Sequence, residues 1–99
     1  MRHRRFYIQS LTVSGRVAPE VGGDLVVARR DETPDLDWEL IYRSARRWPL
    51  AQAPYDLEME GPEGRFEGPA ILVRSDGRSH VFRGVGDLDG FVPEHLSGR

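Results

Sequence analysis

The sequence predicts an all-β fold: a small single-domain barrel or rolled antiparallel sheet of about six strands. Three observations support this prediction. Segments in which apolar and polar residues alternate recur along the chain, as expected for strands with one buried face. In the second half, glycine and proline punctuate the sequence at intervals of about eight to twelve residues. No segment shows the apolar spacing of a long helix.

The length of 99 residues predicts one domain with one core. We expect this domain to span residues 1–99, with residues 1–5 and 94–99 as loose tails.

The first predicted strand covers residues 6–17. Apolar residues alternate in one phase up to Ile8 and in the opposite phase from Leu11 onward. Such a change of phase predicts a bulge or sharp bend near Gln9 and Ser10. The next two predicted strands cover residues 25–29 and 38–43.

Two connecting segments are less regular. Residues 31–37 are acidic and contain a proline, so we expect an exposed loop there. Residues 44–54 contain good helix formers before Pro49 that would allow a single helical turn, but the sequence leaves the conformation of this segment open.

Two hairpins are predicted in the second half. A loop at Gly61–Gly64 would place Glu60 opposite Arg65 and Met59 opposite Phe66, two favourable cross-strand pairs. The second hairpin turns at Asp76-Gly77, a strong signal for a two-residue turn. That turn would pair the following residues: Ile71 with Phe82, Leu72 with Val81, and Val73 with His80. Because both faces of this hairpin are apolar, we expect it to be central and covered on both sides.

The composition excludes several kinds of chemistry. The chain contains no cysteine, which excludes disulfides, thiolate nucleophiles and cysteine-based zinc sites. All fourteen basic residues are arginine, so no lysine is present to form a Schiff base or to bind phosphate in a phosphate loop. The absence of Lys and Asn, whose codons are rich in A and T, indicates a high-GC genome. We expect no cofactor and no metal.

Charge and hydropathy indicate which partners the protein binds and where in the cell it is located. The net charge of −2 and the pI of about 5.9 argue against a dedicated nucleic-acid-binding domain, for which a pI above about 9 is typical. The basic N-terminus is not followed by an apolar run of the kind found in export signals, and no stretch is apolar enough to cross a bilayer. We therefore expect a cytoplasmic protein without membrane contact.

The best candidate for a binding site is a group of arginines beside a tryptophan: Arg43, Arg46, Arg47 and Trp48. Aromatic and arginine side chains are enriched at protein interfaces, and together they also bind single-stranded nucleic acids. The structural alternative is that Trp48 closes one end of the barrel while its arginines extend into solvent. A second group of this kind contains Arg2, Arg4, Arg5, Phe6 and Tyr7.

Of the three histidines, His80 is the one that lies inside a predicted strand. It suits a general base or a pH-sensitive group, with a carboxylate such as Asp87 or Glu67 as its partner. The alternative is a hydrogen-bonded structural histidine. The carboxylates of Asp56, Glu58 and Glu60 share one face of a strand, where they are expected to be solvated. The run from Gly84 to Gly90 is expected to be a bent strand end and a turn.

These observations lead to three functional hypotheses. The first is a non-catalytic interaction or accessory domain that binds a protein partner or a second copy of itself. The second is a single-stranded nucleic-acid-binding barrel of the OB or cold-shock architecture. The third is a small ligand-binding barrel or enzyme that uses His80.

Overall fold

The computed structural model describes residues 2–19, 21–29, 36–92 and 94–97. Within these residues, eight strands form one antiparallel sheet in the order β1-β4-β5-β8-β7-β6-β2-β3, which is not closed into a barrel. The elements are β1 (Arg2–Ile8), β2 (Ser10–Val13), β3 (Arg16–Val17), β4 (Gly22–Arg29), β5 (Leu36–Arg43), β6 (Pro54–Gly61), β7 (Gly64–Ser75), β8 (Ser79–Gly84) and the single helical turn α1 (Glu94–Ser97). The all-β prediction is confirmed.

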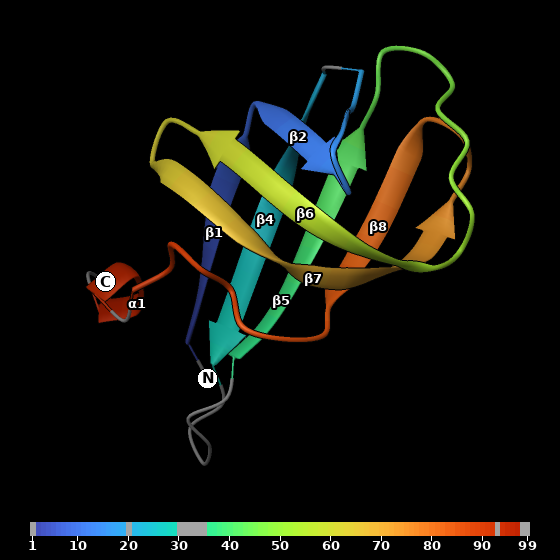
Figure 1. The fold of residues 1–99 in the computed structure, drawn as a ribbon. Helices are drawn as coiled ribbons and strands as arrows, with labels where there is room; N and C mark the ends of the chain where they lie inside the picture. The colour runs from blue at the N-terminus through green and yellow to red at the C-terminus, as the bar shows by residue number, and fades with distance from the viewer. Residues whose placement is uncertain (1, 20, 30–35, 93, 98–99) are drawn as a thin grey trace.

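The sheet bends back on itself, so that β6 and β7 cross in front of β4 and β5 (Figure 1). Apolar side chains from the two halves of the sheet meet between them and form one core. The strands β1, β4, β5 and β8 contribute Phe6, Ile8, Leu25, Val27, Trp38, Leu40, Tyr42 and Phe82, and β2, β6 and β7 contribute Leu11, Val13, Leu57, Met59, Phe66, Ala70 and Leu72. The outer faces of both halves carry the polar residues, as alternation along each strand requires.

The first predicted strand is divided into three. The predicted bend is confirmed, because β1 ends at Ile8, β2 begins at Ser10, and the N–H of Gln9 donates to the carbonyl of Glu60 at 2.8 Å. A turn at Ser14-Gly15 then separates β2 from β3; both residues have positive φ, 47° and 85°. Two positive φ angles in a two-residue loop define a type I′ hairpin turn. This division accounts for eight strands where six were expected.

The hairpin between β6 and β7 has the predicted register, with Glu60 opposite Arg65 and Met59 opposite Phe66. The predicted register of β7 and β8 is wrong. Leu72 lies opposite Phe82, and Ser75 lies opposite His80. The turn is longer than two residues, and a bulge at Val73 then shifts the pairing by one position.

One further expectation is wrong. The hairpin of β7 and β8 is central in the strand order but not covered on both sides, since 39% of Ile71 is exposed. Residues 44–53 form an irregular loop without a helical turn, because their backbone groups bond to the neighbouring turn of β7 and β8. Of the predicted acidic loop, residues 31–35 lie outside the described part of the chain.

Residues near both ends of the chain pack against each other where the sequence predicted loose tails; residues 1 and 98–99 of those tails lie outside the described part of the chain. Arg2 to Arg5 belong to β1 and pair with β4. The imidazole of His95 in α1 packs against the rings of Phe6, Phe66 and Phe91 at centroid distances of 5.1, 6.2 and 5.2 Å. The C-terminal turn therefore lies beside the edge strand β1.

Candidate interaction surface

Five exposed arginines gather at the end of the molecule where β5 ends and β7 turns into β8. We call this group the arginine surface; it consists of Arg43, Arg46, Arg47, Arg74 and Arg78. Among the described residues, no ion pair joins any of them to a carboxylate. The predicted residues Arg43, Arg46 and Arg47 thus lie together, and the fold adds two arginines from a distant part of the chain.

Backbone hydrogen bonds tie together the two segments that carry these arginines. The N–H of Ser44 donates to the carbonyl of Arg78, and the N–H of Trp48 donates to the carbonyl of Gly77, both at 2.7 Å. The guanidinium of Arg47 packs so closely on Gly77 that a Cβ there would lie 2.9 Å from its Cζ. The φ of 97° at Gly77 favours glycine, whereas the contact alone does not require it, because the flexible Arg47 side chain could move aside.

The carboxylate of Asp76 organises the turn itself. It accepts hydrogen bonds from the N–H groups of Arg78 at 3.0 Å and Ser79 at 2.7 Å. These two bonds hold the pKa of the Asp76 carboxyl below its usual value of 3.8, and the bond from Ser79 has the larger effect. The Asp76 carboxylate thus bonds to backbone N–H groups two and three residues further along the same turn. An Asp side chain favours this arrangement, which is called an Asx turn.

Four side chains lie together next to the arginine surface: Ser44, Trp48, Ser75 and His80, which we call the His80 cluster. Ser44, Trp48 and His80 are buried, whereas Ser75 is exposed. Only 8% of Trp48 is exposed, and its indole packs edge-to-face on the imidazole of His80 at 5.7 Å. His80 is completely buried, with Nδ1 2.8 Å from Ser75 Oγ and Nε2 3.4 Å from Ser44 Oγ. Burial lowers the pKa of His80 below its usual 6.5, while the charge of Asp76 acts in the opposite direction.

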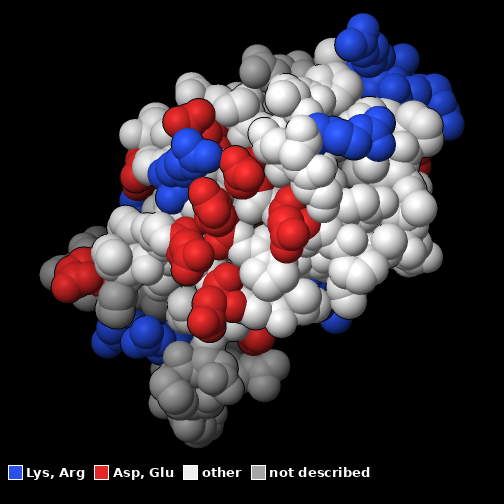
Figure 2. Space-filling model, in the orientation of Figure 1, with Lys and Arg blue, Asp and Glu red and all other residues white. Residues whose placement is uncertain are grey.

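Opposite charges lie on different parts of the surface. The outward face of β6 and β7 carries exposed carboxylates, which we call the acidic face: Asp56, Glu58, Glu60 and Glu67. Figure 2 shows acidic side chains gathered over these two strands, whereas basic side chains project at the end where β7 turns into β8. Within the acidic face, Arg65 bridges Glu58 at 3.0 Å and Glu67 at 3.7 Å.

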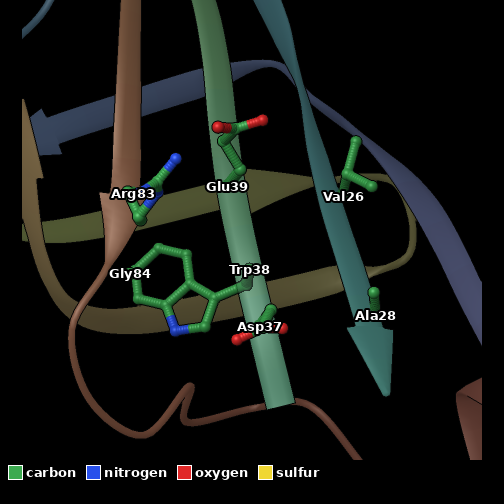
Figure 3. A pocket seen from close by; sticks show the side chains of 7 residues that line it. All are labelled: Val26, Ala28, Asp37, Trp38, Glu39, Arg83 and Gly84. Carbon is green, nitrogen blue, oxygen red and sulfur yellow. The ribbon is translucent and has the colours of Figure 1, made fainter. Parts of the chain in front are cut away.

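The outer face of β5 and its neighbours contains two shallow hollows. One, of about 440 Å³, is shown in Figure 3 and is lined by Val26, Ala28, Asp37, Trp38, Glu39, Arg83 and Gly84. The other, of about 470 Å³, adjoins the arginine surface and is lined by Glu39, Ile41, Arg74, Asp76, Ser79 and Val81. The second hollow adds two apolar side chains, Ile41 and Val81, beside the exposed arginines.

The structure separates His80 from its predicted carboxylate partners. Glu67 lies eight residues before Ser75, the residue of β7 that contacts His80. With a rise of about 3.3 Å per strand residue, Glu67 and Ser75 are roughly 26 Å apart along β7. The backbone of Asp87 lies beside Gly68, near Glu67 rather than His80. The hydroxyls of Ser44 and Ser75 contact the imidazole instead, and its complete burial excludes contact with a substrate in this conformation.

The second predicted group of arginines and aromatic residues is dispersed. Phe6 is buried in the core, and the guanidinium of Arg4 lies 4.9 Å from the centre of its ring. Arg4 also pairs with Glu63 and donates to the carbonyl of His95. Tyr7 is the aromatic residue of this group that remains exposed, at 48%.

Four residues of this surface and of the His80 cluster were not predicted from the sequence: Ser44, Ser75, Arg74 and Arg78. A weak signal for Ser75 was present, because it directly precedes the Asp-Gly turn that leads to His80. Ser44 and His80 are separated by 36 positions, so no local pattern links them.

Fold and surface together define a small all-β domain with one bent antiparallel sheet and an arginine-rich end. Comparison with models of protein families, with curated proteins and with solved structures finds no match. Within the described ranges, no three His, Asp or Glu side chains are grouped so that they could hold a metal ion. None of the helical residues described belongs to a helix long and apolar enough to span a membrane.

Proposed function

We propose that this protein is a non-catalytic interaction domain that binds an acidic segment of a protein partner through the arginine surface. The observation that carries this proposal is the group of five exposed arginines without a carboxylate partner among the described residues. A guanidinium is weakly hydrated and binds a carboxylate through two parallel hydrogen bonds, so it is well suited to acidic side chains at an interface.

The underlying backbone supports the same proposal. The bonds from Ser44 to Arg78 and from Trp48 to Gly77 position the two arginine-bearing turns before a partner arrives. Preorganisation of this kind reduces the ordering cost of binding. The adjoining hollow, with Ile41 and Val81 among its lining residues, favours a segment that also carries an apolar side chain.

Nucleic acid is the second candidate, and the burial of Trp48 makes it less favourable. Proteins that bind single strands stack bases on exposed aromatic rings. Here the ring beside the arginines is in the core, and only 8% of it is exposed. Trp48 therefore supports the arginine surface from beneath rather than contacting the partner itself.

The test measures binding of a fluorescent oligo-glutamate peptide and of a single-stranded oligonucleotide of equal charge. The variant is Arg46→Glu/Arg47→Glu, and the matched control is Arg2→Glu/Arg16→Glu, which changes the net charge equally on the edge strands β1 and β3. We expect the first variant to weaken peptide binding at least about tenfold and the control to change it less than about twofold.

Equal losses in both variants would show that net charge alone drives binding, and would refute the assigned surface. Tighter binding of the oligonucleotide, with a steep salt dependence that the first variant abolishes, would support the nucleic-acid candidate instead. Circular dichroism and thermal unfolding of each variant check that the fold is retained.

A further inference from the structure

The His80 cluster joins the two turns that carry the arginine surface. His80 is completely buried on β8, and its Cα partner on β5 is Tyr42. Ser75, at the end of β7, meets one ring nitrogen, and Ser44, at the start of the 44–53 loop, meets the other. Trp48 closes the cluster with its edge-to-face contact. One imidazole thus contacts side chains from both turns.

The hydrogen-bond distances around the ring fit a neutral imidazole with its proton on Nε2. The Ser44 hydroxyl lies 2.8 Å from the carbonyl of Arg46 and 3.3 Å from that of Arg78, and when it donates to one of them its oxygen is free to accept from Nε2–H at 3.4 Å. The Ser75 oxygen accepts from the N–H of Gly77 at 3.4 Å, and its hydroxyl donates to Nδ1 at 2.8 Å. A neutral imidazole with its proton on Nε2 satisfies every one of these groups.

A second proton on the ring would disturb this arrangement. Nδ1 would then carry a hydrogen that faces the hydroxyl hydrogen of Ser75, so this hydroxyl would have to rotate away. The positive charge would also lie on a side chain that is completely buried. Among the described residues, the charged and titratable groups beside the cluster include Tyr42, the Cα partner of His80 on β5, Arg47, whose guanidinium lies against Gly77, and Asp76 in the turn. The nearest carboxylate, Asp76, already accepts two backbone hydrogen bonds.

We propose that His80 makes the arginine surface sensitive to pH: neutral His80 holds residues 44–48 against residues 75–79, and protonation in mildly acidic solution separates them. The consequence for partner binding rests on the function proposed above. Acidification then disperses the arginines, and the partner is released.

The direction of the pH effect follows from the burial of the ring. Since burial lowers the pKa of His80 in the folded protein below 6.5, the unfolded or locally opened chain binds the proton more readily. The contribution of His80 to the stability of this region is therefore complete above pH 6.5. It is lost as the pH falls from there through the lower folded-state pKa.

Hydrogen exchange tests the proposal without any partner. The reporters are the N–H groups of Ser44 and Trp48, which bond across the two turns, and the reference is the N–H of Ser14, which bonds to Asp56 at 2.7 Å on a different part of the sheet. Between about pH 7.5 and pH 5, we expect protection factors at Ser44 and Trp48 to fall at least about tenfold, and at Ser14 less than about twofold.

Two variants separate titration of His80 from other effects of acid. His80→Gln provides a neutral donor and acceptor, and we expect it to remove the pH dependence at Ser44 and Trp48. Should this variant fail to fold, Ser75→Ala serves instead. It removes the hydroxyl that stabilises neutral His80, so the transition should move to higher pH, whereas a purely structural role would lower protection equally at every pH.

Unchanged protection at Ser44 and Trp48 down to about pH 5 would overturn the proposal. An equal loss at Ser14 would also overturn it, because the whole sheet would then be opening. Peptide binding is measured over the same range. Loss of protection with unchanged binding would confirm the pH-sensitive cluster and contradict the arginine surface as the binding site, so the two proposals fail separately.

Discussion

The indole of Trp38 lies directly against Gly84, in the space that a side chain on residue 84 would occupy (Figure 3). Its Nε1–H donates to the carbonyl of Gly86 at 2.9 Å, and only 3% of the residue is exposed. The glycine at the end of β8 therefore allows the largest side chain of β5 to pack across the sheet. We expect Gly84→Ala to lower the free energy of unfolding by about 1–3 kcal/mol, because a methyl group would displace the indole.

Chemical denaturation measures this effect, and Val85→Ala provides the control. Val85 is the next residue and is 54% exposed, so its truncation should change stability by less than about 0.5 kcal/mol. Trp38→Leu should make the Gly84→Ala substitution less costly, because it removes the overlapping ring. Equal costs of Gly84→Ala with and without the indole would contradict the proposed contact.

Gly15 is expected to be required for its backbone conformation alone. Its φ is 85°, and a Cβ at this position would meet no atom within 4 Å. We expect Gly15→Ala to destabilise the protein by about 1 kcal/mol, since alanine is strained at positive φ. Gly15→Asn should cost less, because asparagine enters this region more readily. Thermal unfolding ranks the two variants, and the reverse ranking would count against the type I′ turn.

Arg65 is expected to offset the repulsion between two carboxylates that face each other. Glu58 and Glu67 are direct partners across β6 and β7, and Arg65 contacts both. We expect Arg65→Gln to lower stability by less than about 1 kcal/mol at low salt, and the loss to shrink as salt screens the charges. Adding Glu58→Gln should restore most of the loss. A loss that does not depend on salt would point to packing instead.

Arg4 and Arg5 are adjacent but are expected to differ in their effect on stability. Arg4 contacts the ring of Phe6, the carboxylate of Glu63 and the carbonyl of His95. Arg5 has only a 4.0 Å approach to Asp24 and is 66% exposed. Arg4→Ala should cost about 1 kcal/mol, whereas Arg5→Ala should cost less than about 0.5 kcal/mol. Urea unfolding compares them, and equal effects would contradict a role for Arg4 in holding the C-terminal turn.

The amino-acid sequence by itself determined the local features of this protein. The alternation of Leu57 and Met59 with acidic residues identified the two faces of β6, and the loop at residues 61–64 defined its register with β7. The change of phase between Ile8 and Leu11 located the bend between β1 and β2. Each of these features depends on neighbours in the chain, through side-chain alternation and turn geometry.

The tertiary structure alone decided the order of the strands and the surroundings of the candidate residues. β5 pairs with β8 across a long intervening segment, and this pairing brings Arg43 to Ser79 and Ser44 to His80. Trp48 was a candidate contact residue in the sequence, and it is buried because the turn of β7 and β8 folds against it. Such contacts depend on the packing of the whole core, which stabilises many distant pairings together, and no short segment specifies them.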